Sequence, residues 1–168
     1  AVRLDADPLA HDSIEPHVIA TSSTTVLVGW IDYRSGFPDP YVARSTDAGG
    51  TWAAPVRVDT GTAAGASGSF DIDLAGSGAL IAAVWADDRA GLLDIYANFS
   101  LDGGANWQPQ DYRLDTSALG TSDSLEPHVY ATPTSFHTVW IDHRRGAGCP
   151  IATGTSCPNG DIFYRRVQ

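Results

Sequence analysis

Three tryptophans, Trp30, Trp85 and Trp140, lie 55 residues apart, and the sequence around each of them is repeated. The copies read VGWIDYRSG, AVWADDRAG and TVWIDHRRG, so an Asp, an Arg and a Gly follow each Trp at two-residue intervals. Related segments precede each Trp (SIEPHVIA, SFDIDLAG, SLEPHVYA) and follow it (PDPYVARS, LDIYANFS, GDIFYRRV). A repeat of this length built from short β-rich runs predicts three blades of a β-propeller. The repeated polar residues are Asp32, Arg34 and Asp39, then Asp87, Arg89 and Asp94, then Asp142, Arg144 and Asp161.

The choice of charged and small residues favours strands and turns. All ten basic residues are Arg, and eighteen of the twenty acidic residues are Asp. Asp and the 17 Gly are common in turns and unfavourable inside helices, so a helical bundle is excluded and an all-β fold is predicted. Alternation predicts four strands in each unit, near 70–74, 80–86, 94–100 and 110–115 in the second. Pro16 and Pro127 fall in the first strand of the other units, which predicts that this strand is an inner edge of its blade.

Two segments between the third and fourth expected strands, 45–52 and 100–107, share the pattern S-x-D-x-G-x-[T/N]-W. This pattern resembles the Asp box of the sialidase-like, or BNR-repeat, β-propellers. The resemblance implies a structural turn away from the ligand face, in which the Asp accepts backbone N–H groups, Gly adopts a positive φ and Trp packs on the blade. The residues concerned are Ser45, Asp47, Gly49 and Trp52 in the first box, and Ser100, Asp102, Gly104 and Trp107 in the second.

The whole chain, residues 1–168, is predicted to be one propeller segment. Residues 2–7 (VRLDAD) match the fourth strands of the first two units (VRVDTG and YRLDTS), so they are expected to be a strand of the same kind. Blade one is placed at about 13–61, blade two at about 69–117 and blade three at about 124–168, where the third lacks its own fourth strand.

Because closed propellers have 4–8 blades, three blades need a partner. We expect a head-to-tail homodimer in which residues 2–7 of each copy complete the last blade of the other, giving a six-bladed ring. The same contact without closure would grow an open filament. The alternative is a fragment of a longer propeller chain, and the absence of Met together with a start at Ala1 fits a processed or excised chain.

The formal net charge of −10 argues against nucleic acid and anionic membranes as partners. No apolar run approaches the roughly 18 residues of a membrane-spanning helix.

The third unit contains both cysteines. Asp142 and Asp161 lie 19 positions apart, against 7 in the other two units, so a twelve-residue insertion separates them. A disulfide between Cys149 and Cys157 is predicted, which indicates a secreted protein, extracellular or periplasmic. A thiolate metal site is the alternative, although two thiols alone are weak evidence for one.

Candidate ligand-binding residues lie on the face that would hold the loops between the second and third strands and the starts of the first strands. Residues at i and i+2 project from the same side of a strand, so the first strands would present acidic and His side chains to a central channel. Such a ring could take a polar ligand or a divalent cation, with carboxylates suiting Ca²⁺, although no cofactor is required. Structural hydrogen bonds and ion pairs within the blades are the competing interpretation. The candidates are Glu15, His17, Asp71, Asp73, Glu126 and His128, together with Arg34, Arg89 and Arg144.

The family resemblance raises the question of sialidase activity. Catalytic sialidases use an Arg-Ile-Pro motif, an arginine triad, a Tyr/Glu nucleophilic pair and an Asp acid/base. No Arg-Ile-Pro is present, the only Glu residues are Glu15 and Glu126 in the repeat, and the repeated arginines lack the irregular placement of a triad. No catalytic residue is therefore assigned. We expect a non-catalytic secreted module for binding, with glycans as one ligand class, or for self-assembly. The alternative is a sialidase-type glycoside hydrolase or a fragment of one.

Overall fold

A computed structural model describes residues 1–5, 7–9, 11–144 and 160–168, and in these residues it contains three antiparallel sheets and no helix. The first sheet has the order β1-β2-β3-β4 and the second β5-β6-β7-β8, while the third has three strands in the order β11-β10-β9. The strands of the first sheet are β1 (Ser13–Ala20), β2 (Val26–Asp32), β3 (Asp39–Ser45) and β4 (Val56–Arg57). Those of the second are β5 (Ser69–Ser77), β6 (Leu80–Asp87), β7 (Asp94–Ser100) and β8 (Tyr112–Arg113). Those of the third are β9 (Ser124–Thr132), β10 (Ser135–Asp142) and β11 (Asp161–Val167).

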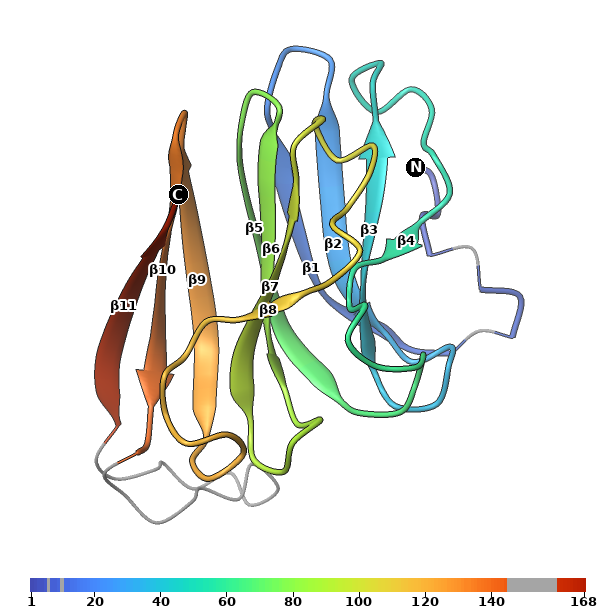
Figure 1. Cartoon of the computed structure of the whole chain (residues 1–168). Helices are drawn as coiled ribbons and strands as arrows, with labels where there is room; N and C mark the ends of the chain where they lie inside the picture. The colour runs from blue at the N-terminus through green and yellow to red at the C-terminus, as the bar shows by residue number, and fades with distance from the viewer. Residues whose placement is uncertain (6, 10, 145–159) are drawn as a thin grey trace.

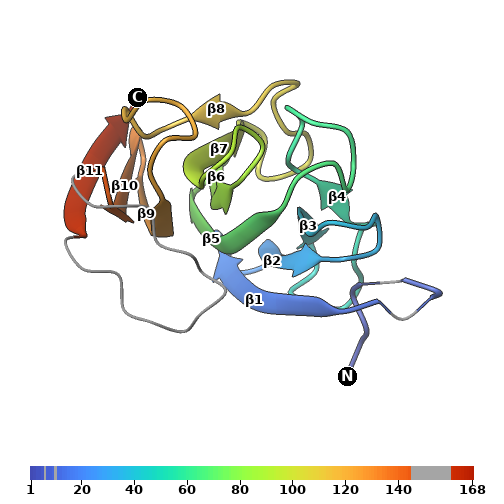
Figure 2. The same ribbon diagram turned by 90° about the horizontal axis from the view of Figure 1, so that it is seen from below.

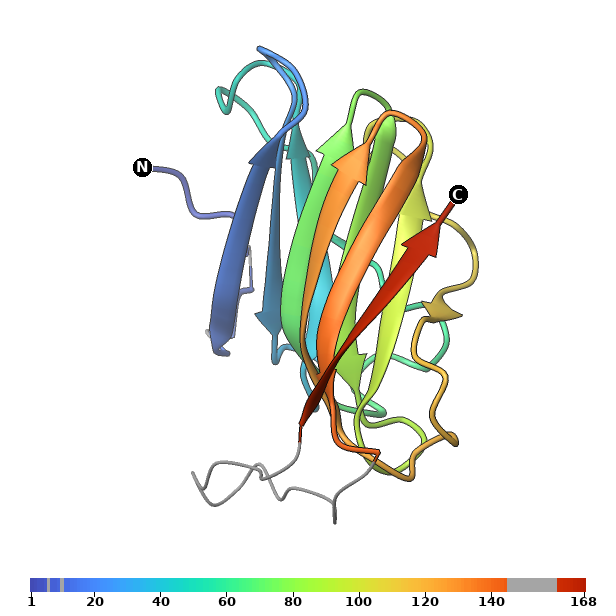
Figure 3. The same ribbon diagram turned by 90° about the vertical axis from the view of Figure 1, so that its left-hand side faces the viewer.

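The three sheets stand side by side with their strands running in nearly the same direction (Figures 1 and 3). Viewed along the strands, they spread from an inner side, where β1, β5 and β9 are neighbours, to an outer side that holds β4 and β8 (Figure 2). This all-β arrangement fits a propeller-like fold in which each sheet is one blade. It contains three blades and no closed ring, and no helix in the described parts is long and apolar enough to cross a membrane.

The core lies between neighbouring sheets and repeats from one interface to the next. Between the first and second sheets, Leu27, Ile31 and Val42 pack against Trp85 and Tyr96. The second interface uses the corresponding positions, namely Ala86, Ala97, Trp140 and Phe163. The second sheet therefore buries one face against the first sheet and the other against the third.

The strands of the second sheet lie close to their expected positions, except that β8 is only two residues long. Beyond Arg113, the chain still forms hydrogen bonds to β7, but one of the acceptors is a side chain. The Leu114 N–H donates to the carbonyl of Ile95, whose own N–H donates to a carboxylate oxygen of Asp115 at 2.9 Å. Because a side chain takes the place of a backbone carbonyl, the regular ladder ends there.

The start of the chain lies against the first sheet and forms no strand in residues 1–5. Arg34 donates to the backbone carbonyl of Asp5 at 2.6 Å, which fastens this segment to the loop between β2 and β3. The sequence predicts that this segment pairs with β11 of a second copy, and the structure contains one copy. The N-terminus and β11 lie at opposite ends of the row of sheets (Figure 2).

Candidate functional site

The six acidic and His candidates of the inner strands line one open cavity of about 510 Å³. Pro16, Ile72 and Pro127 complete its wall. The three repeated arginines do not line this cavity, so the structure divides the predicted ligand residues into two separate groups. The residues of the cavity are Glu15, His17, Asp71, Asp73, Glu126 and His128.

A bulge in each inner strand sets the shape of this cavity. The pairing of β1 with β2 passes from Ile14 opposite Ile31 directly to His17 opposite Gly29, and β5 and β9 repeat the shift. The backbone reaches the left-handed region at the bulge, with φ of 53° at Glu15, 57° at Asp71 and 50° at Glu126. The expectation of simple alternation is therefore wrong locally, since an extra residue interrupts the two-residue period and residues i, i+1 and i+2 all face the cavity.

Side chains at the bulges connect each blade to the next. A carboxylate oxygen of Glu15 accepts the Asp71 N–H at 2.7 Å, and Asp71 in turn accepts the Glu126 N–H at 3.4 Å. Two residues further along, Nδ1 of His17 accepts the Leu74 N–H at 3.3 Å, and Asp73 accepts the Val129 N–H at 2.8 Å. These residues form two parallel series of hydrogen bonds around the inner side of the sheets.

Electrostatics within the cavity combine burial with close carboxylates. Burial raises the pKa of Glu15 and of Asp71 above the ordinary values, because it disfavours the charged carboxylate. Nε2 of His17 lies 3.0 Å from Asp73, and Nδ1 of His128 lies 3.5 Å from the other oxygen of the same carboxylate. Within the described residues, no three His, Cys, Asp or Glu side chains are grouped in a way that could hold a metal ion.

The repeated arginines have the same local geometry in all three blades. In each, the Arg Nε donates to one oxygen of the Asp two residues before it, at 2.8–3.0 Å, and Nη2 donates to the other at 2.5–2.7 Å. The indole N–H of the repeated Trp donates to the same carboxylate in all three copies. Each guanidinium also covers a ring, that of Tyr41, Tyr96 or Phe163. The arginines are therefore used within the framework.

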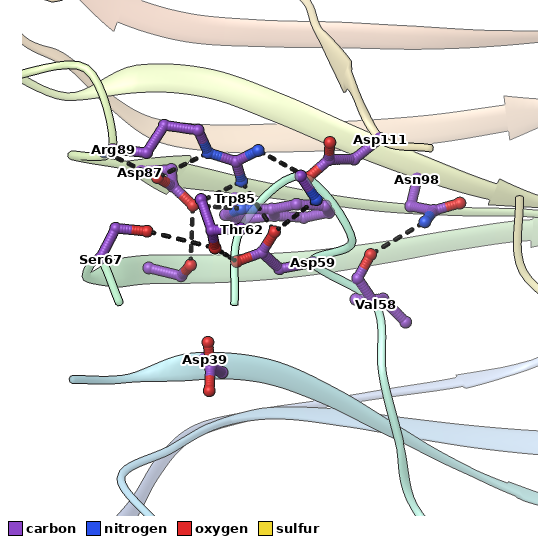
Figure 4. Close-up of polar contacts among 12 residues, drawn as sticks. Asp39, Val58, Asp59, Thr62, Ser67, Trp85, Asp87, Arg89, Asn98 and Asp111 are labelled. Carbon is purple, nitrogen blue, oxygen red and sulfur yellow. Dashed lines mark hydrogen bonds and ion pairs between the residues drawn. The ribbon is translucent and has the colours of Figure 1, made fainter. Parts of the chain in front are cut away.

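The second blade has the largest ion-pair network, and it crosses the first interface between sheets (Figure 4). Besides Asp87, Arg89 contacts Asp59 at 3.0 Å and Asp111 at 2.9 Å. Burial opposes ionisation of Asp87, yet the hydrogen bonds from Arg89 hold the pKa of Asp87 below its ordinary value. Asp59 has the opposite balance: its burial outweighs the attraction of Arg89 and raises its pKa to about 6.

The raised pKa of Asp59 predicts a distinctive pH dependence of stability. A carboxyl group with a higher pKa in the folded state binds more protons when folded. Its contribution is therefore present below about pH 4 and is lost as the pH rises towards 6. Replacing Asp59 with asparagine is expected to remove about 2 kcal/mol of this pH dependence. Urea unfolding between pH 4 and 7 measures it, with the exposed Asp12→Asn as control, and an unchanged slope in Asp59→Asn would contradict the assignment.

The two Asp-box turns have matching hydrogen bonds. Asp47 accepts from the backbone N–H and the hydroxyl of Thr51 at 2.8 and 2.7 Å, and Asp102 accepts from the backbone and side chain of Asn106 at the same two distances. Ser45 and Ser100 each donate to the box Asp at 2.8 Å. Gly49 and Gly104 have φ of 86° and 85°, as the turn requires. The Trp52 indole N–H donates to the Gly49 carbonyl, which closes the first turn.

Hydrogen bonds from residues 51 and 106 lower the pKa of Asp47 and of Asp102 to about 2. A lowered pKa gives stability that is present above about pH 4 and is lost as the pH falls to 2. The double variant Asp47→Asn, Asp102→Asn is expected to be less stable at pH 7, and its unfolding between pH 4 and 2 should take up about two fewer protons. The slope of unfolding free energy against pH measures this number. An acid limb identical to that of the unchanged protein would contradict the prediction.

Sequence reasoning did not assign Asp59 or Asp111 to a site. Asp59 belongs to the repeated VRVDTG segment, so its recurrence could have indicated a structural role. Asp111 belongs to no repeated segment that would have indicated one. The predicted pair Cys149 and Cys157 lies outside the described residues.

The fold and the repeated site define a class, an all-β chain of propeller-like blades joined by polar contacts. No protein-family model and no curated protein matches the sequence. Among the solved structures that match is the K499G mutant of NanB sialidase from Streptococcus pneumoniae, at 12% identity and a TM-score of 0.44. The match covers 74% of this chain and 18% of the sialidase chain, so this chain spans less than a fifth of that protein's length.

Proposed function

We propose that the chain is a non-catalytic, exported propeller module that binds a polar ligand in the cavity of its inner strands. The observation that carries the non-catalytic part of this proposal is the bidentate pairing of Arg34, Arg89 and Arg144 with neighbouring carboxylates. A guanidinium that already donates twice to an Asp is poorly placed to hold the carboxylate of a substrate. The arginines that would have to act as a sialidase triad instead support the blades.

The cavity supplies the polar groups for such a ligand. Carboxylates and imidazoles accept hydrogen bonds from hydroxyl groups, so a glycan without a carboxylate suits this acidic surface better than a sialic acid. Asp73 lies between His17 and His128, which places acceptor and donor groups within one ligand's reach. A divalent cation is the competing ligand, because carboxylates favour Ca²⁺. Since no three of the described side chains are grouped to hold one, the cation would take its remaining ligands from water or from the glycan.

A glycan array together with an aryl-glycoside panel tests this function. We expect binding to a neutral glycan that His128→Ala weakens at least tenfold, because the His128 side chain lines the cavity and is 75% exposed. No turnover of an aryl sialoside or of the other aryl glycosides is expected. His11→Ala is the matched control, because His11 does not line the cavity. Melting in Ca²⁺ and in EDTA tests the cation form. Turnover of an aryl sialoside would overturn the non-catalytic proposal, and the absence of any bound glycan or cation would overturn the binding role.

A further inference from the structure

We propose that the outer face of the third sheet binds the outer face of the first sheet of a second copy, so that two chains close one six-bladed ring. This inference is independent of the ligand proposed above. Its basis is that the chain contains two interfaces of this kind, first sheet on second and second on third. The contacts that these two interfaces share indicate which residues would have to meet in a third interface of the same kind.

The apolar residues on the two outer faces are exposed where their equivalents are buried. On the first sheet, Val18 is 63% exposed, whereas Leu74, at the same place in the second blade, is 2% exposed against the first sheet. On the third sheet, Ile162 is 73% exposed, whereas its equivalent Ile95 is fully buried. Both outer faces therefore have the side chains of an interface.

These residues correspond pairwise across the known interfaces. Leu74 packs close to Gly29 of the first sheet, and Val129 belongs to the same core cluster as Val84 of the second. The equivalent pair in a third interface is Val18 with Val139 of the other copy. Val139 is exposed in the single chain, as the proposal requires.

The hydrogen bonds at the bulges give the same pairing independently. Glu15 binds the Asp71 N–H, and Asp71 binds the Glu126 N–H. If the same hydrogen bond forms between the third blade and the first blade of a second copy, the Glu126 carboxylate accepts the Glu15 N–H of that copy. Within the described part of the chain, the Glu126 carboxylate has no hydrogen-bond partner.

The start of the chain already occupies the position of a preceding fourth strand. Arg34 donates to the backbone carbonyl of Asp5, and Arg89 contacts the side-chain carboxylate of Asp59, the equivalent residue at the end of the first blade. Arg3, Leu4 and Trp30 line a cavity of about 270 Å³ between this segment and the first sheet. We expect side chains from the outer face of the second copy's third sheet to fill this space.

The ladders of β4 and β8 then set the register of the new strand pair. Val42 is opposite Val56, and Ala97 is opposite Tyr112. The equivalent partners are Tyr164 on β11 and Val2 of the second copy. Antiparallel partners have Cα atoms about 4.5–5.5 Å apart, which is within the range a disulfide can join.

Light scattering after size exclusion tests the ring. The unchanged chain is expected at twice 17.7 kDa. Tyr164→Glu is expected at the mass of one chain, because its equivalents Val42 and Ala97 are buried between sheets and the charge would be buried against the first sheet of the second copy. Leu119→Glu is the matched control, since Leu119 is 57% exposed and Tyr164 is 59%, and Leu119 lies in the connection between β8 and β9. A single-chain mass for the unchanged protein, or a mass that grows with concentration as a filament would, overturns the proposal.

A designed disulfide tests the register. We expect Val2→Cys combined with Tyr164→Cys to give a covalent dimer on oxidation, with residues 2 and 164 joined in a single peptide pair. Val2→Cys combined with Leu119→Cys is the control and should give no such product. Because the N-terminus and β11 lie at opposite ends of the row of sheets (Figure 2), the bond is expected to join two copies. Equal cross-linking in both double variants would overturn the pairing.

Discussion

Replacing Arg89 with methionine is expected to lower the free energy of unfolding by about 3–5 kcal/mol, the range for removing one partner of a buried ion pair. The Arg89 side chain is 11% exposed and contacts three carboxylates, those of Asp59, Asp87 and Asp111. Methionine can keep an apolar stem against the Tyr96 ring, but it provides none of the N–H donors. The variant therefore leaves three nearly or fully buried carboxylates without their shared cation.

Arg144→Met is the matched control for this effect. Arg144 makes the same bidentate contact, to Asp142, but its side chain is 25% exposed and its further bond is to the Thr116 hydroxyl at 3.3 Å. We expect about half the loss found at Arg89, measured by urea unfolding at pH 7. The Arg89→Met deficit should also shrink towards pH 5, because Asp59 can then take up a proton. Equal losses of unfolding free energy in both variants, or an Arg89→Met loss that does not change with pH, would contradict a stabilising role for the contacts of Arg89 with Asp59 and Asp111.

The parts of the fold that could be predicted from the sequence are those set by local physics. β7 begins and ends at the expected residues, 94 and 100, because a mainly apolar run lies between an Asp and the Ser that opens the Asp-box turn. Residues 80–87 follow the same logic. The repeat then carries these boundaries into the other units. An all-β chain of repeated sheets was therefore accessible before any coordinates.

The candidate site was harder to predict from the sequence, because it depends on how the sheets pack against one another. Asp111 lies 22 residues from Arg89 and Asp59 lies 30 residues away, and only the contact of two sheets brings all three together. The bulges were also hidden. Their left-handed residues are Glu15, Asp71 and Glu126, so no glycine marked the interruption in the sequence. Spacing alone thus grouped the arginines with the inner-strand acids, which the structure separates.

Replacing Trp85 with alanine should cost about 3–5 kcal/mol of unfolding free energy, as expected for a large aromatic side chain removed from a core. Trp85 is fully buried and packs in one cluster with Leu27, Ile31 and Val42 of the preceding sheet, so the cavity would open between two blades. Neither β6 nor the first sheet can close that space without shifting a hydrogen-bonded ladder. Alanine also removes the indole N–H that donates to Asp87 at 3.2 Å.

Two further variants separate these contributions. Trp85→Phe keeps most of the apolar volume and loses mainly the bond to Asp87, so a loss of about 1–2 kcal/mol is expected. Trp52→Ala removes a half-buried ring from an Asp-box turn, where the indole N–H donates to the Gly49 carbonyl, and should cost less than Trp85→Ala because solvent can fill the site. Urea denaturation followed by far-ultraviolet circular dichroism compares the three. If Trp52→Ala lowered the unfolding free energy as much as Trp85→Ala, the Asp-box turns would contribute as much to stability as the packing between blades. The tryptophans that repeat every 55 residues would then not mark the contacts that contribute most to stability.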